Sequence, residues 1–168
     1  MVIGPESTGK STLSSDLAES LNTVWVPEYA RGYLEALERP YNESDLLLIA
    51  KGQIGEEERL SAEASRWLVC DTDLYVIKVW SEHSFGGCDA RILQWIAGRK
   101  YDAYLLTFTD IEWSYDPLRE HPEDKMRYYF YHQYRDIVMN SGLPWADIRG
   151  SREDRLRLSL EAIRSFNL

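Results

Sequence analysis

The sequence is poor in cysteine and histidine, and it lacks long hydrophobic runs. Its two cysteines, Cys70 and Cys88, are too few for a disulfide framework and favour a reducing, cytoplasmic environment. The three histidines show no metal-ligand spacing with them, so we predict no zinc site. Apolar runs such as residues 46–50 are far shorter than the roughly 20 residues that cross a bilayer. The N-terminus has none of the basic and apolar regions of a signal peptide, so no membrane association is expected.

Positive charge is also scarce. The chain has 19 Lys and Arg against 28 Asp and Glu, a formal net charge of −9, which counts against a protein that works on duplex DNA. With 168 residues, 44% of them hydrophobic and 28% charged, the composition is that of one soluble globular domain. A chain of this length buries roughly two thirds of its unfolded surface, so it needs neither disulfides nor a structural metal. We therefore expect a small-molecule partner and no nucleic acid; the composition leaves the oligomeric state open.

Short β-type runs alternate with longer helical patterns along the chain. Runs of strand type are centred on residues 2–3, 24–26, 67–70, 101–108 and 145–148. Apolar residues at helical spacing occupy about residues 11–22, 44–64, 92–98, 126–142 and the segment after 151. Ser151 and Asp154 resemble a capping box, whereas Gly52 and Gly55 should each weaken their helix by about 1 kcal/mol. The alternation predicts one α/β domain over residues 1–168, in three layers, with a central parallel sheet of about five strands and helices on both faces.

Residues 4–11 read Gly-Pro-Glu-Ser-Thr-Gly-Lys-Ser and fit the P-loop pattern G-x-x-x-x-G-K-[ST], between a strand and an amphipathic helix. Gly4 and Gly9 permit torsions that a Cβ would forbid, so that successive N–H groups and the helix N-terminus can face an anion. Lys10 can then reach the β- and γ-phosphates, and the Ser11 hydroxyl can bind Mg²⁺. A glycine turn that only caps a helix is the alternative. The predicted nucleotide-phosphate residues are Gly4, Glu6, Ser7, Thr8, Gly9, Lys10, Ser11 and Thr12.

A second carboxylate, normally at the end of an apolar strand, is needed to hold Mg²⁺ through water. Asp71 follows the run 67–70 and is the candidate, with Ser11 as the other metal residue. A helix N-cap or a solvated loop acid is the alternative for both Asp71 and Asp73. The N-K-x-D guanine reader of switch GTPases is missing, and a helicase would be larger and more basic. These features leave a small-molecule kinase or a nucleotide-sensing module.

The other groups that phosphoryl transfer requires can be placed from their order in the chain. Glu28 follows the strand run 24–26, so it should emerge at the carboxyl end of that strand, where open α/β sheets bind ligands. Arg119 and Arg127 lie in or just after the charged, irregular stretch 110–124, and we predict a lid-like segment around residues 110–127. A solvated charge on a helix face is the alternative for each arginine.

Several motifs together carry a family resemblance. They are Gly4-Pro-Glu-Ser-Thr-Gly-Lys-Ser-Thr12, Val26-Pro-Glu-Tyr-Ala-Arg31, Cys70-Asp-Thr-Asp73, Val79-Trp80, Thr109-Asp-Ile-Glu-Trp113 and Asp116-Pro-Leu-Arg-Glu120. In order and over nearly the whole chain, they resemble the ribosylnicotinamide kinase domain of NadR-type proteins. The resemblance implies a P-loop kinase fold and an enzyme of NAD salvage that uses ATP and Mg²⁺ to phosphorylate the 5′-hydroxyl of nicotinamide riboside, giving nicotinamide mononucleotide. NadR proteins often carry an N-terminal adenylyltransferase domain, so we expect a stand-alone kinase or a kinase taken from a longer protein.

The resemblance also implies roles for single residues. Lys10 and the P-loop amides bind the ATP phosphates, and Ser11 with Asp71 organises Mg²⁺. Glu28 or Asp71 accepts the proton of the 5′-hydroxyl. Arg119 and Arg127 neutralise charge on the transferred phosphoryl group. The predicted catalytic set is Glu28, Asp71, Lys10, Arg119 and Arg127.

Nicotinamide riboside is a pyridinium cation, which suits an aromatic and acidic slot. The candidate substrate-binding residues are Glu28, Tyr29, Asp73, Trp80, Asp110 and Trp113, with Asp73 a candidate for the ribose hydroxyls. Ordinary packing is the alternative for the three aromatic residues. Gly150 and Arg152 are implied to lie at the adenine. The competing functions are a kinase for another nucleoside or small hydroxyl substrate, and an ATP-binding sensor without turnover.

Overall fold

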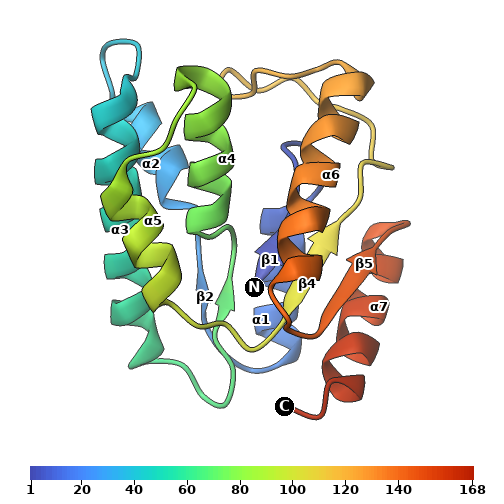
Figure 1. Ribbon diagram of the computed structural model, residues 1–168. Helices are drawn as coiled ribbons and strands as arrows, with labels where there is room; N and C mark the ends of the chain where they lie inside the picture. Colours follow the sequence, from blue (N-terminus) through green and yellow to red (C-terminus); the bar gives the residue numbers. More distant parts are fainter.

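The computed structural model describes all residues from 1 to 168, and one or two helices separate each strand from the next along the chain (Figure 1). The elements are β1 (Val2–Ile3), α1 (Lys10–Ser20), β2 (Trp25–Val26), α2 (Tyr29–Glu35), α3 (Glu43–Ser61), β3 (Val69–Cys70), α4 (Leu74–Phe85), α5 (Ala90–Gly98), β4 (Tyr104–Thr107), α6 (Asp124–Asn140), β5 (Trp145–Ile148) and α7 (Arg152–Ser165). Each strand lies within or coincides with the run that predicted it. Three of them are shorter than the run: β2 and β3 each consist of its last two residues, and β4 of four residues within it.

All strand pairs are parallel, as the alternation of elements predicts. Strands β1, β4 and β5 form one sheet in the order β1-β4-β5, and β2 pairs with β3. A parallel bridge between Val2 and Asp71 joins the two groups, and the Thr72 amide donates to the Val2 carbonyl at 3.0 Å. The five strands therefore lie in the order β2-β3-β1-β4-β5, and the carboxyl ends of all of them meet at one edge.

Helices cover both faces of this sheet, which gives the three layers. On one face α1 and α7 pack together against Val2 and Leu105. On the other face α4 and α6 cover Ile3 and Leu106. Neighbouring strand residues thus point to opposite faces, which is why the strands are apolar at nearly every position, with Thr107 and Asp147 as the exceptions. The chain has the α/β architecture of the P-loop kinase fold, with the parallel sheet flanked by helices.

Helix boundaries follow local side-chain chemistry. The Ser151 side chain accepts a hydrogen bond from the Asp154 amide, and the Asp154 carboxylate accepts one from the Ser151 amide, so the predicted capping box opens α7. Asn42 and Asp45 form a second capping box at the start of α3. Helix α3 continues through Gly52, where a Cβ would collide with the ring of Tyr29. No helix is both long and apolar enough to cross a lipid bilayer.

Candidate nucleotide and acceptor cleft

The loop between β1 and α1 has the backbone of an anion site. Ser7 and Gly9 have φ values of 54° and 74°, in the left-handed region, so that successive N–H groups of the loop form a concave nest at the N-terminus of α1. Gly4 has a φ of 154°, and a Cβ there would lie 2.8 Å from the Thr107 carbonyl oxygen. The Lys10 Nζ donates to the Pro5 carbonyl at 2.8 Å, which folds this cation back over the nest. The loop thus presents N–H donors, a helix terminus and an ammonium group together.

A cleft of about 480 Å³ extends from this loop between α2, α4 and the segment that follows β4. Residues 4–12 line one end, and Glu28 and Arg119 lie on its walls. An aromatic group also lines the cleft: Tyr41, Trp80, His83, Phe130 and Tyr134. Among the predicted site residues, the structure brings Glu28, Trp80 and Arg119 together with the phosphate loop.

Asp71 lies directly behind this cleft, at the end of β3. Its carboxylate is fully buried, and neither oxygen has a hydrogen-bond partner. Burial raises the pKa of Asp71 to about 6; the charge of Lys10 opposes the rise and that of Glu28 adds to it. An unpartnered carboxylate close to the Ser11 hydroxyl is a donor set that suits Mg²⁺, which prefers oxygen ligands and keeps several of its waters. These two residues therefore fit the metal for which the sequence predicts them.

Glu28 emerges beside Asp71 because β2 and β3 are neighbouring parallel strands. Pro27 separates Glu28 from β2, and Glu28 is the N-cap residue of α2. Its side chain makes no capping hydrogen bond and is half-buried in the wall of the cleft. A carboxylate with no internal partner, open to the cleft and near the phosphate loop, can accept a proton from a bound hydroxyl.

The segment between β4 and α6 lies over the phosphate loop and closes one side of the cleft. The Glu6 carboxylate accepts hydrogen bonds from the amides of Glu120 and His121, at 3.1 and 2.5 Å. The Ser7 hydroxyl accepts one from the Ser114 amide at 3.1 Å. Arg119 donates to the Ser114 carbonyl at 2.6 Å, which holds its guanidinium on the cleft wall.

Two contacts join this segment to α2 and to the loop before α3, on the aromatic side of the cleft. Arg31 forms an ion pair with Asp116, with Nη2 and Oδ2 2.9 Å apart. The Tyr41 hydroxyl donates to the Glu120 carboxylate at 3.0 Å. Residues 114–121 are therefore held on three sides, by the phosphate loop, by α2 and by the loop before α3.

The family of the chain follows from comparison with known proteins. A family model described as an AAA domain (AAA_28) matches residues 1–155. The chain belongs to this family. No match was found among curated protein sequences.

Solved structures of other proteins share the fold of this chain. Two of them are similar with a TM-score of 0.78: "NadR protein in complex with NR", at 22% identity, and "NadR protein in complex with NAD and AMP-PNP", at 23%. Each match covers 98% of this chain, and 49% and 48% of the NadR chains, so the chain spans about half of their length. The resemblance predicted from the motifs is thus confirmed as a likeness of fold.

Several predicted site residues of the AAA domain lie outside the cleft. Asp73 is fully buried and caps α4 by accepting from the amides of Tyr75 and Val76, so the N-cap alternative describes its position. Burial raises its pKa to about 7. Its side chain lines a separate cavity of about 290 Å³. The ring of Tyr29 packs over Gly52, and Trp113 lies beside Tyr115.

Asp110, predicted to bind the substrate, and the residues predicted near the adenine are held by other protein groups, and Arg127, predicted at the transferred phosphoryl group, lies outside the cleft. Asp110 accepts from the Gly150 amide at 2.7 Å and forms an ion pair with Arg155. Arg152 is exposed and pairs with Asp16 on α1. Arg127 is buried behind the phosphate loop and does not line the cleft.

Sequence reasoning missed Tyr41, Arg31 and Arg155. Tyr41 stands in an irregular segment with no pattern around it, and only the fold brings it to Trp80. Arg31 lies inside the quoted motif 26–31, and that position was the available signal. Arg155 falls on the helical pattern of α7, where nothing distinguishes it from the exposed arginines near it.

Proposed function

We propose that this AAA domain is a kinase that transfers a phosphoryl group from ATP, with Mg²⁺, to the 5′-hydroxyl of nicotinamide riboside. The observation that carries the proposal is the lining of one cleft, which combines the phosphate loop, an aromatic and acidic group of side chains, and the carboxylate of Glu28, which makes no capping hydrogen bond. The two NadR structures of the same fold contain NR in one case and NAD with AMP-PNP in the other. Residues 1–168 form the kinase domain in this proposal, and residues 110–127 contain its lid.

The aromatic end suits a flat cation. The Trp80 indole donates through Nε1 to the Tyr41 hydroxyl at 3.0 Å, and the two rings meet edge to face with centroids 4.8 Å apart. The Tyr41 hydroxyl donates in turn to Glu120, which brings a carboxylate to the same place. A cation over an aromatic face gains about 0.5–2 kcal/mol, more when water is excluded. Tyr41 thus replaces Tyr29 and Trp113 as the partner of Trp80 in the proposed slot for the pyridinium.

The phosphoryl transfer itself needs positioning and charge more than covalent chemistry. Glu28 accepts the proton of the 5′-hydroxyl, because its carboxylate faces the cleft and Asp71 is enclosed behind it. Lys10 and Arg119 neutralise negative charge on the phosphates. Ser11 and Asp71 would hold Mg²⁺, which would supply positive charge to balance that of the phosphates. The segment 114–121 excludes water from the reacting end.

The first experiment measures ADP release with Mg-ATP and nicotinamide riboside, beside cytidine, uridine and deoxynucleosides. Turnover with the riboside at about 1–100 s⁻¹, the usual kinase range, supports the proposal. Turnover with a different nucleoside only would keep the kinase and reject the pyridinium slot. ATP binding without turnover on any acceptor would favour a sensor.

The role of Glu28 is tested by Glu28→Gln, which keeps the shape and removes the basic oxygen. We expect kcat to fall by about 100-fold or more, with the KM for ATP unchanged. The matched control is Glu38→Gln, an exposed glutamate outside the cleft, which should leave kcat as it is. Near wild-type kcat in Glu28→Gln would transfer the role to Asp71.

A further inference from the structure

The phosphate loop is held from behind by two buried arginines that do not enter the cleft. Arg127 Nη2 donates to the Ser7 carbonyl at 3.2 Å, and Arg155 Nη1 donates to the Thr8 carbonyl at 3.0 Å. Each arginine residue is 2% exposed, and neither lines the cleft. They come from α6 and α7, more than 100 residues away in the chain. Two successive carbonyls of the motif therefore depend on two distant guanidinium groups.

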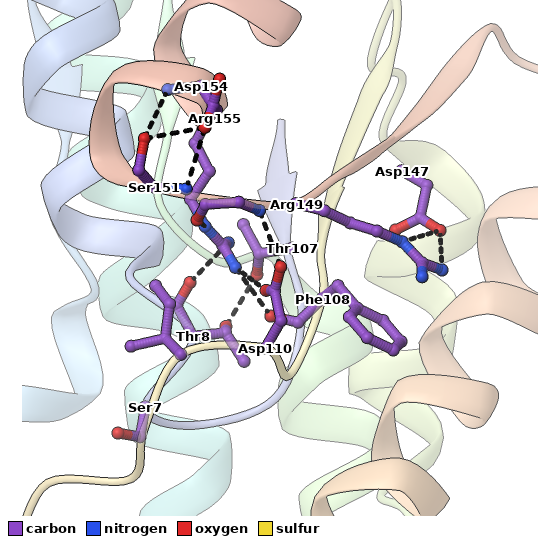
Figure 2. Close-up of polar contacts among 12 residues, drawn as sticks. Ser7, Thr8, Thr107, Phe108, Asp110, Asp147, Arg149, Ser151, Asp154 and Arg155 are labelled. Carbon is purple, nitrogen blue, oxygen red and sulfur yellow. Dashed lines mark hydrogen bonds and ion pairs between the residues drawn. The ribbon is translucent and has the colours of Figure 1, made fainter.

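Both arginines also hold the segment that begins the lid. Arg127 Nη2 donates to the Ile111 carbonyl at 2.8 Å. Arg155 Nη2 donates to the Phe108 carbonyl at 3.1 Å and pairs with Asp110, and its Nε donates to the Gly150 carbonyl at 2.9 Å (Figure 2). The phosphate loop and the two loops after β4 and β5 are thus joined through these side chains.

The orientation of these carbonyls decides which way the loop amides point. In a peptide unit the N–H and the C=O point in opposite directions, so a carbonyl turned away from the nest leaves the next amide turned into it. A buried carbonyl without a donor is costly, and a guanidinium supplies donors in a rigid planar fork. Ser7 additionally holds a φ of 54°, which a non-glycine residue seldom adopts without support.

We propose that Arg127 and Arg155 are positioning residues that keep the amides of the phosphate loop directed at the nucleotide and join this loop to the base of the lid. For Arg127, this positioning role replaces the contact with the transferred phosphoryl group that was predicted from the sequence. The proposal depends on nucleotide binding by the loop and not on the identity of the acceptor.

The test compares the affinities of ATP and ADP in Arg127→Met and Arg155→Met, measured by calorimetry without acceptor. ADP lacks the γ-phosphate, so replacing a residue that contacts this phosphate lowers the affinity for ATP and leaves the affinity for ADP unchanged. Replacing a residue that positions the loop weakens the binding of both nucleotides. We expect the Kd for ATP and the Kd for ADP each to rise about 10-fold, so that the ratio of the two Kd values stays within about twofold of the wild-type ratio. The control is Arg164→Met, an exposed arginine in the last turn of α7, which should change neither affinity.

Two further measurements keep the result clear if the Met variants fold poorly. Arg127→Lys and Arg155→Lys keep the positive charge but lose the planar set of guanidinium donors. They should weaken the binding of ATP and ADP equally, by less than the Met variants do. Hydrogen exchange of amides 5–11 should be faster in the variants while the strands stay protected. A loss confined to ATP, or unchanged affinities together with a lower melting temperature, would overturn the inference. A wild-type protein that binds neither nucleotide would instead overturn the proposed function.

Discussion

Gly52 and Gly55 lie three residues apart in α3, and the same substitution should have opposite effects at the two sites. A Cβ on Gly52 would lie 2.5 Å from Cδ1 of Tyr29 and closer still to other atoms of its ring. A Cβ on Gly55 would have no heavy atom within 4 Å. The helical backbone is the same in both cases, so any difference between the two variants measures the contact with Tyr29.

The magnitudes follow from two opposing effects. Replacing glycine by alanine inside a helix gains about 1 kcal/mol, so Gly55→Ala should raise the free energy of unfolding by that amount. In Gly52→Ala the ring must move, and such overpacking costs about 1–3 kcal/mol. The second variant should therefore lie between neutral and about 2 kcal/mol less stable than the wild type. The two variants should differ by about 1–3 kcal/mol.

The assay is urea unfolding of both variants, with and without Tyr29→Ala. In the Tyr29→Ala background the collision is gone, so Gly52→Ala should recover the gain of about 1 kcal/mol. The Tyr29 amide also donates to the Gln53 side chain at 2.9 Å, and Tyr29 follows Glu28. A shift of the Tyr29 ring should displace the neighbouring Glu28, the proposed base. We therefore expect kcat to fall in Gly52→Ala and to stay unchanged in Gly55→Ala. Equal stabilisation by both substitutions would refute the argument that Gly52 makes room for Tyr29.

Three further predictions concern the acceptor, the metal and pH. Trp80→Ala should raise the KM for nicotinamide riboside about 5- to 30-fold and leave the Kd for ATP unchanged; an unchanged KM would remove Trp80 from the slot. Asp71→Asn should raise the Mg²⁺ concentration for half-maximal rate at least about 10-fold, while nucleotide affinity measured in EDTA stays the same. Hydrogen bonds from Arg39 hold the pKa of Asp45 below its ordinary value, so its charged form stabilises the fold above about pH 4 and this stabilisation is lost as the pH falls further. The urea midpoint should therefore decline between pH 5 and 3, and Asp45→Asn should show a flatter decline.

The phosphate loop and the order of the elements were determined by the sequence itself. The P-loop motif, the strand before it and the helix after it are local features, so a local pattern is sufficient to place them, whereas the close approach of Gly4 to Thr107 is set by the fold. The position of Glu28 beside Asp71 also follows from the chain, because each residue comes after a strand and parallel strands end at the same edge. The exact bounds of the three shorter strands could not be predicted from the sequence, since which residues of a run pair depends on a strand distant in sequence.

Only the tertiary structure decided what the remaining polar side chains contact. Asp110 stands in a motif that suggested a substrate contact, and it forms an ion pair with Arg155, 45 residues later. Asp73 caps the helix that follows it and opens onto a different cavity. Tyr41 reaches Trp80 across 39 residues with no pattern to indicate it. A charged or aromatic side chain can be satisfied by any complementary group that the fold brings near, so its partner is set by packing and not by the residues on either side of it.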